Sequence, residues 1–188
     1  MPQPQIRHPS ELAELVERIR AGEVAAFEAL FETFHAPLCA FAYRYVSRRD
    51  IAEEIVQEVF LFVWTHRATW NVRDSVKNYL FTAVRNAAMS WVRHELVVHR
   101  HDATTVAFTT PMPSPVDREL AAAELATAVR RAVERLPERC RLIFTLHREQ
   151  GLTYAEIAAV LDLSPKTVET QMGRALKALR KSLAAYRP

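Results

Sequence analysis

Glycine is scarce in this chain of 188 residues, which contains only Gly22, Gly151 and Gly173. Average usage near 7% would give roughly thirteen. Glycine supplies the positive φ angles of tight hairpins and of loops that surround phosphates. Three isolated glycines cannot form a GxGxxG motif, a Walker loop or a GxSxG elbow. The sequence therefore disfavours dinucleotide-binding proteins, P-loop NTPases and serine hydrolases.

Cysteine is also rare, and Cys39 and Cys140 lie 101 positions apart with no zinc-ligand spacing. We expect two reduced residues and no disulfide. Glu32-x-x-His35 is the one fragment of a di-metal bundle motif, which needs two such fragments and two further carboxylates. His94, His99 and His101 lack cysteine partners. We therefore expect no metal, no cofactor and no catalytic residue.

Long hydrophobic runs are missing too, because no stretch approaches the roughly 18 apolar residues of a membrane span. The first nine residues contain no apolar run. We predict a cytoplasmic protein without membrane insertion.

Charge is distributed unevenly. Up to Glu95 there are 11 basic and 12 acidic residues, whereas from Lys166 to the end there are 6 basic residues and one acidic residue, Glu169. A basic terminal helix indicates nucleic acid or another acidic surface as its partner.

Prolines divide the chain, because Pro111, Pro113 and Pro115 lie in a threonine-rich stretch without helical periodicity. Such a stretch is typical of an extended linker. Helical periodicity occurs on both sides of it, which predicts an all-α protein with two small helical domains on a flexible linker. The expected parts are an N-terminal extension with a short helix (1–22), a first domain (23–96), the linker (97–117) and a second domain (118–186).

Four helical segments are expected in the first part of the chain. Ser10 is predicted to cap a helix that ends at Arg20, and Pro37 to bend or divide a longer one over residues 27–45. Asp50 is predicted to cap the third helix, and a fourth covers residues 76–93. The buried stripe of the third helix would be Ile51, Ile55, Val59, Phe62 and Val63.

Four more helices are predicted after the linker: residues 117–136, a helix with Pro137 at its first position, residues 153–161 and residues 165–184. Gly151 should adopt a left-handed conformation after the second of these. The inward stripe of the last helix would be Val168, Met172, Ala175, Leu176, Leu179 and Leu183.

The last two helices form the most informative motif. Thr153 and Glu156 have the spacing of a capping box, and a short turn at residues 162–164 leads to Pro165. Two short helices joined in this way predict a helix-turn-helix, whose second helix enters the DNA major groove. The outward face of that helix has hydrogen-bonding side chains first and cations later, an order that suits base edges and then phosphates.

Several segments resemble the extracytoplasmic-function group of the sigma-70 family. Residues 136–139 (LPER), 151–158 (GLTYAEIA) and 164–169 (SPKTVE) are similar to region 4 of that family. Residues 50–60 (DIAEEIVQEVF) are similar to region 2.2, and residues 79–86 (YLFTAVRN) to regions 2.3 and 2.4. The resemblance covers about residues 25–182, with the motifs in the family's order.

The resemblance implies a sigma factor, not an enzyme, with core RNA polymerase and promoter DNA as partners; an anti-sigma protein is a common further partner in the family. Region 2.2 would bind the polymerase through Glu54, Gln57, Glu58, Phe60 and Trp64. The acidic residues of this set suit a basic partner surface. The alternative is a helix-turn-helix regulator of the two-component type. Its receiver domain would need alternating strands, which the first 95 residues do not predict.

Promoter contacts are implied in both domains. A pocket for an unstacked base of the −10 element would involve Trp70, Asn71, Arg73, Asp74 and Ser75, although Trp70 would fit the core equally well. The adjoining strand would be contacted by Lys77, Asn78, Arg85, Asn86 and Arg93. The −35 element would be read by Ser164, Lys166, Thr167, Glu169, Thr170, Gln171, Arg174, Lys177 and Arg180.

Two departures from the family's pattern leave the −35 sequence open. Asp162 occupies a turn position where many relatives have glycine, and Glu169 stands where a basic residue is frequent. A glutamate can accept a hydrogen bond from cytosine but repels phosphate.

Overall fold

The computed structural model describes residues 9–72, 75–98 and 120–184, and within these ranges it contains eight helices and no strand. The all-α prediction is confirmed. The chain divides into two compact units, Met1–Pro111 and Met112–Pro188. Most of the predicted linker, with His99 and His101, lies outside the described residues. The helices are α1 (Pro9–Arg20), α2 (Val24–Val46), α3 (Arg49–Thr65), α4 (Val76–Val98), α5 (Leu120–Glu134), α6 (Glu138–Arg148), α7 (Tyr154–Leu161) and α8 (Pro165–Ser182).

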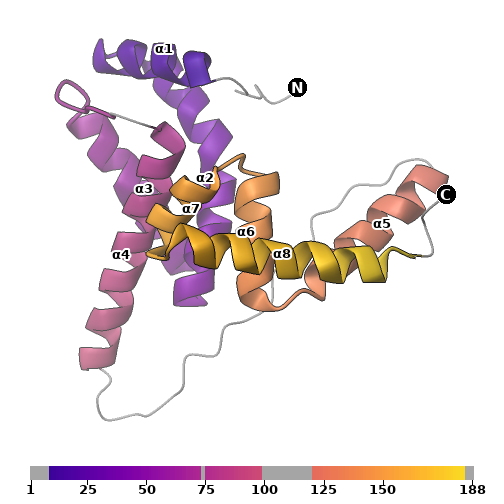
Figure 1. Cartoon of the computed structure of the whole chain (residues 1–188). Coiled ribbons are helices and arrows are strands. Elements are labelled where there is room, and N and C mark those ends of the chain that lie inside the picture. The colour runs from indigo at the N-terminus through magenta and orange to yellow at the C-terminus, as the bar shows by residue number, and fades with distance from the viewer. Residues whose placement is uncertain (1–8, 73–74, 99–119, 185–188) are drawn as a thin grey trace. The chain divides into compact units, whose positions relative to one another are not determined.

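In the first unit, α2 is the central helix and packs against α1, α3 and α4 (Figure 1). It runs unbroken through Pro37, so the proline does not divide it. Apolar residues at spacings of three and four explain the packing, since they form one continuous face. The buried residues of α2 are Ala26, Leu30, Phe34, Leu38, Phe41, Ala42 and Val46.

By length and composition alone, α2 is apolar enough to cross a membrane, contrary to the expectation that no segment comes close. Its packing, in contrast, is that of a core helix. Three other helices of the unit cover it, and aromatic rings from α3 and α4 contact Phe27 and Phe41 on it. A helix that is apolar on several sides is typical of a domain core as well as of a membrane span.

Two predicted N-caps in this unit are wrong. Ser10 lies inside α1, which begins at Pro9. The residue preceding α3 is Arg48, and Asp50 lies in its first turn, where the carboxylate accepts a hydrogen bond of 2.6 Å from Arg48. Neither α2 nor α3 has a side-chain cap.

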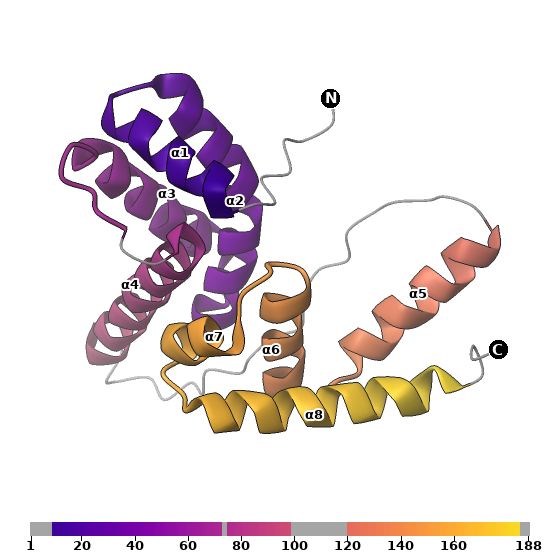
Figure 2. The same ribbon diagram turned by 45° about the horizontal axis from the view of Figure 1, so that its top comes forward.

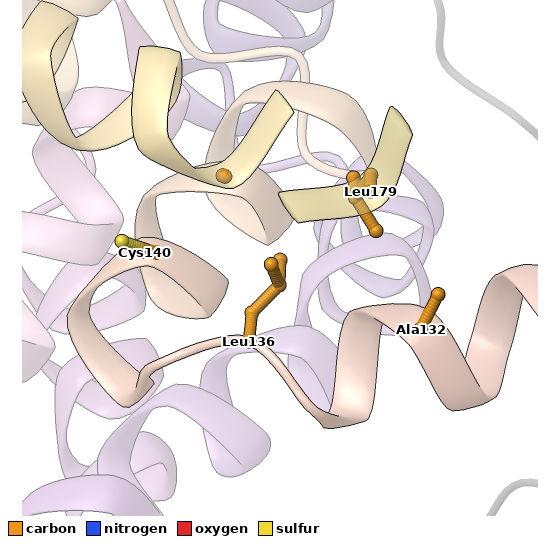
Figure 3. Packing of buried hydrophobic residues seen from close by; sticks show 5 residues of the cluster. Ala132, Leu136, Cys140 and Leu179 are labelled. Carbon is orange, nitrogen blue, oxygen red and sulfur yellow. The ribbon is translucent and has the colours of Figure 1, made fainter. Parts of the chain in front are cut away.

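In the second unit, α8 packs against α5, α6 and α7 (Figure 2). One buried cluster joins α5, the start of α6 and α8; its members are Ala132, Leu136, Cys140, Ala175 and Leu179 (Figure 3). Leu176, predicted to point inward, is instead 38% exposed. Pro137 precedes α6 as its cap residue, one position earlier than predicted.

The helix-turn-helix prediction is confirmed in its local details. Thr153 and Glu156 form a capping box at the start of α7, and Ser164 caps α8 through the Thr167 N–H at 3.1 Å. The turn between them contains Asp162 at φ 56° and ψ 53°, a left-handed conformation that aspartate tolerates. Gly151, at φ 68°, is left-handed as predicted. These contacts fix how α8 leaves the turn, and so which of its faces is exposed.

Candidate protein and nucleic-acid interfaces

The outer face of α3 combines acidic and apolar side chains. Glu54, Gln57 and Glu58 are exposed, as predicted for a partner-binding face. Beyond them, Leu61 is 64% and Phe62 is 52% exposed. Phe62 was expected in the buried stripe, and neither residue was predicted to bind a partner. Large apolar side chains in water beside charged residues mark an interaction surface.

Phe60 is 2% exposed, so its place in the predicted polymerase-binding set is wrong. Its ring packs edge-on against Phe27 of α2, with ring centroids 6.0 Å apart, and against Phe31 at 4.9 Å. Trp64 is half-buried; its ring lies 5.0 Å from Phe27, and the Arg67 guanidinium lies 4.4 Å from its centroid. These aromatic contacts hold α3 on α2 and orient its outer face.

Phe62 and His66 form an exposed pair at the end of α3. Their rings stack with centroids 4.1 Å apart and an interplanar angle of 25°. The His66 ring is also tied to the Phe62 carbonyl oxygen by a 3.0 Å contact from Nδ1. This pairing restricts the Phe62 side chain before any partner binds, which lowers the entropy lost on binding.

A cavity of about 430 Å³ opens beside the start of α4. Ser75 precedes the helix, and its hydroxyl accepts a hydrogen bond from the Asn78 N–H at 3.3 Å. Several polar side chains lie on one face because they recur three or four positions apart. The lining residues are Asn71, Val72, Ser75, Asn78, Tyr79, Thr82, Ala83 and Asn86. A pocket with one aromatic wall and several amide groups suits a nucleobase.

Sequence reasoning found four of the lining residues, Asn71, Ser75, Asn78 and Asn86, and missed Tyr79 and Thr82. The signal was present, since residues 75, 79, 82 and 86 have the spacing of one helix face. The Tyr79 hydroxyl can donate a hydrogen bond, since a tyrosine is neutral near pH 7, and burial raises its pKa further.

Trp70, at 4% exposure, is a core residue and does not line the pocket. Its ring packs against Tyr79, with centroids 5.7 Å apart. Trp70 therefore supports the aromatic wall of the pocket from within the fold. Of its predicted companions, Arg73 and Asp74 lie outside the described residues.

The predicted strand-contacting residues lie along α4 at different depths. Lys77 and Arg85 are half-buried, whereas Asn86 and Arg93 are exposed. Arg85 lies close to the Tyr45 hydroxyl. Burial raises the pKa of this hydroxyl, and the positive charge of Arg85 partly offsets the rise. The Arg93 Nε donates to the Met89 carbonyl oxygen at 3.3 Å. These cations extend from the pocket toward the end of α4.

The exposed face of α8 is basic. Five cations are exposed together with Glu169 and Thr170. They are Lys166, Arg174, Lys177, Arg180 and Lys181. The hydroxyls near the helix start have internal partners as well: Thr170 donates to the Lys166 carbonyl oxygen at 2.8 Å, and Ser164 and Thr167 bond each other at 2.8 Å. The Thr170 oxygen, which only donates in this contact, keeps its lone pairs for an outside donor.

Gln171 differs from the other predicted DNA-reading residues because it is turned toward α6. The thiol of buried Cys140 donates to the Gln171 Oε1 at 3.1 Å, and Gln171 is half-buried. Its carboxamide oxygen is therefore engaged within the unit. The sequence gives no sign of this contact, since the two residues lie 31 positions apart.

The described residues contain no group of three or more His, Cys, Asp or Glu side chains that could hold a metal ion. His35, from the rejected di-metal motif, packs on Phe31 with ring centroids 4.5 Å apart and lies 3.6 Å from the Cys39 sulfur. Burial, and then the charge of Glu53, raise the pKa of the Cys39 thiol to about 11.

Family models of the two sigma-70 regions match this chain. The region 2 model matches residues 30–95, and the region 4 model matches residues 126–179, so that together they cover more than half of the chain. The first match contains α3 and the polar pocket, and the second contains the helix-turn-helix.

Similar proteins include two RNA polymerase sigma factors. The extracytoplasmic-function factor SigX of Bacillus subtilis is 28% identical over 167 residues, which are 86% of this chain and 85% of SigX. The extracytoplasmic-function sigma-E factor of Escherichia coli K12 is 29% identical over 180 residues, which are 88% of this chain and 90% of that protein.

Two solved structures share the fold. CnrH in complex with the cytosolic domain of CnrY has a TM-score of 0.53 at 24% identity, covering 92% of this chain and 96% of CnrH. The sigma factor RpoE of Bartonella quintana in complex with the anti-sigma factor NepR has a TM-score of 0.54 at 21% identity, covering 95% and 97%.

Proposed function

The chain belongs to the extracytoplasmic-function group of the sigma-70 family, and we propose that it binds core RNA polymerase and directs it to promoters with −10 and −35 elements. The observation that carries this proposal is that one chain has two surfaces of opposite charge. One is the acidic and apolar face of α3, and the other is the basic face of α8 behind a helix-turn-helix. A receiver-type regulator is not favoured, since residues 9–72 and 75–98 contain helices only.

The polymerase-binding surface in this proposal is the outer face of α3. Leu61 and Phe62 supply apolar contact, and Glu54, Gln57 and Glu58 supply charge and register. A surface with apolar anchors beside acidic groups fits a helical partner that presents apolar and basic side chains. Trp64 supports this face through its contact with Phe27.

The −10 contact in this proposal is the cavity at the start of α4. An extruded base would stack near Tyr79 and bond to the amides of Asn71, Asn78 and Asn86. Opening a base step costs a few kcal/mol, which such contacts must offset. Lys77, Arg85 and Arg93 would then follow the strand through its phosphates.

The −35 contact in this proposal is α8. Lys166, Glu169 and Thr170 in its first turns would face base edges, and Arg174, Lys177 and Arg180 would face phosphates. Ser164 and Thr167 order the start of the helix through their own hydrogen bonds.

The proposal also includes regulation by an anti-sigma protein. It further holds that the protein is cytoplasmic and has no catalytic activity. The Bartonella sigma factor RpoE is in complex with the anti-sigma factor NepR, and CnrH is in complex with the cytosolic domain of CnrY. An inhibitor that covered the face of α3 would block polymerase binding directly.

Transcription with purified components tests the proposed function. The full chain is added to a bacterial core RNA polymerase on genomic DNA, and the transcripts are sequenced. We expect new start sites that share two spaced elements, and none with core polymerase alone. Absence of both core binding and new transcripts would refute the proposal.

A further inference from the structure

Gly173 lies in the middle of α8, where glycine is unfavourable for helix formation. Glycine is commonly placed for a structural reason, such as a left-handed φ angle outside a helix or, inside one, a neighbour that leaves no room for a side chain. Gly151 in the same unit has the first of these reasons, because its φ is 68°.

Neither reason applies to Gly173. Its backbone is helical, and a Cβ atom built on it would meet no heavy atom within 4 Å. An alanine would therefore fit without any movement and would favour the helix. The fold of this unit therefore has room for a side chain at residue 173, although the residue there is glycine.

The position of Gly173 on the helix suggests what replaces a side chain there. Residues 166, 170, 173, 177 and 180 follow one another at spacings of three and four, so they lie on one face. This face is opposite the buried residues Val168, Met172, Ala175 and Leu179. Gly173 is thus a gap in a line that otherwise consists of Lys166, Thr170, Lys177 and Arg180, all exposed.

We propose that Gly173 is the point of closest approach between α8 and promoter DNA, where the missing side chain admits the sugar–phosphate wall of the major groove. Lys166 and Thr170 then lie on the base side of this point, and Lys177 and Arg180 on the phosphate side. Gly173 sets the depth of the helix in the groove. Gln171 does not, because the Gln171 side-chain oxygen accepts a hydrogen bond from Cys140 within the unit. This inference rests on the proposed −35 contact of α8.

Two variants of the full chain, Gly173→Ala and Gly173→Leu, test the inference. Holoenzyme with each variant is titrated with a promoter fragment found by transcript sequencing, and with the same fragment carrying a scrambled −35 element. We expect affinity for the intact promoter to fall about threefold for alanine and more than about tenfold for leucine, because a helix held farther out no longer reaches the base edges of the −35 element. Binding to the scrambled fragment should be unchanged, and the urea midpoint of the alanine variant should equal or exceed that of the parent.

Ala126→Leu is the matched control, since it places the same leucine side chain at an exposed position of α5. It should bind both fragments as the parent does. Parent-like binding by both Gly173 variants would overturn the inference, as would an equal loss on intact and scrambled DNA. Failure of the proposed function would look different, because the unsubstituted chain itself would not bind core polymerase or the promoter.

Discussion

Helices α3 and α8 have nearly the same length, 17 and 18 residues, and both bury one apolar stripe against their own unit. Their outer faces are opposite. In α3, four acidic residues accompany one arginine, and Leu61 and Phe62 are exposed. In α8, five basic residues accompany one glutamate. The buried stripe therefore accounts for the fold of each helix, and the outer face determines the chemistry of its partner.

The two helices also begin differently. The cap position of α3 is Arg48, which makes no side-chain cap bond, whereas α7 and α8 are capped by Thr153 and Ser164. Length explains only the cap of α7, which has eight residues, since the capped α8 is slightly longer than α3. A short helix gains proportionately more from a cap, because its unpaired N–H groups are a larger share of the whole.

The largest effect is expected from placing charge in the apolar part of the α3 face. Leu61→Glu combined with Phe62→Glu should weaken core polymerase binding by more than about a hundredfold, since two anchors are lost and two like charges are added. Fluorescence anisotropy of labelled protein titrated with core polymerase measures this change.

Val24→Glu is the control for that experiment, because Val24 is a similarly exposed apolar residue, at 54%, on α2. It should bind core polymerase like the parent. All three substituted side chains are exposed, so the far-UV spectrum and urea midpoint should stay nearly unchanged. Normal polymerase binding by the double variant would remove the contrast between the two faces.

A smaller effect is expected at α8. Arg174→Ala should lower promoter affinity about three- to tenfold for every −35 sequence and reduce the slope of log affinity against log salt by about one, as for one phosphate contact. Filter binding of holoenzyme across a salt series measures both quantities.

Arg131→Ala removes the same charge from an exposed position of α5 and is the matched control. Its salt slope should equal that of the parent. If both variants reduced the slope equally, the basic face of α8 would act only through net charge, and the proposed phosphate contact would be refuted.

Sequence patterns predicted the helices and the turn well, because caps and periodicity are local properties. The capping box of Thr153 and Glu156, the turn at residues 162–164 and the left-handed Gly151 were all predicted from neighbours within a few positions. A capping box requires only the two residues that form it, so no knowledge of the rest of the fold is needed.

The error at Phe60 and Phe62 has a different origin. Residues 59–64, VFLFVW, are apolar without a break, so periodicity cannot choose which of them face inward. The choice is made by α2, whose Phe27 and Phe31 receive the Phe60 ring and leave Phe62 outside. Gln171 could not be assigned for the same reason, since its partner Cys140 belongs to another helix.

Removal of a cap tests the second difference between the units. Thr153→Ala should destabilise the second unit by about 1 kcal/mol, because the capping-box bonds at α7 are lost. Its thermal midpoint should fall by about 4–8 °C for a unit of this size. Amide hydrogen exchange in α7 should accelerate, while exchange in α3 stays as in the parent.

Arg48→Ala is the contrasting change at α3. Arg48 makes no cap bond, and its ion pair with Asp50 is exposed, so the loss should lie within the error of the unfolding measurement. Equal destabilisation by the two substitutions would mean that caps matter no more in the second unit than in the first.

The smallest effect concerns Cys39 on α2, whose thiol pKa responds to an acidic residue of α3. Burial, and then the nearby Glu53, raise its pKa from 9.0 to about 11, so the thiolate fraction near pH 8 is about a hundredfold below that of an ordinary cysteine. Alkylation of Cys39, followed by mass spectrometry of its peptide, should therefore rise between pH 9 and 11 in the native protein, and near pH 9 in urea. Because the folded-state pKa is raised, the folded state loses stability over the same interval as pH increases.

Glu53→Gln should move the native curve of Cys39 alkylation slightly toward lower pH, and Glu54→Gln should move it less, since only Glu53 contributes to the shift. A native midpoint near 9 would show that Cys39 is neither buried from solvent nor influenced by the acidic residues that distinguish α3 from α8.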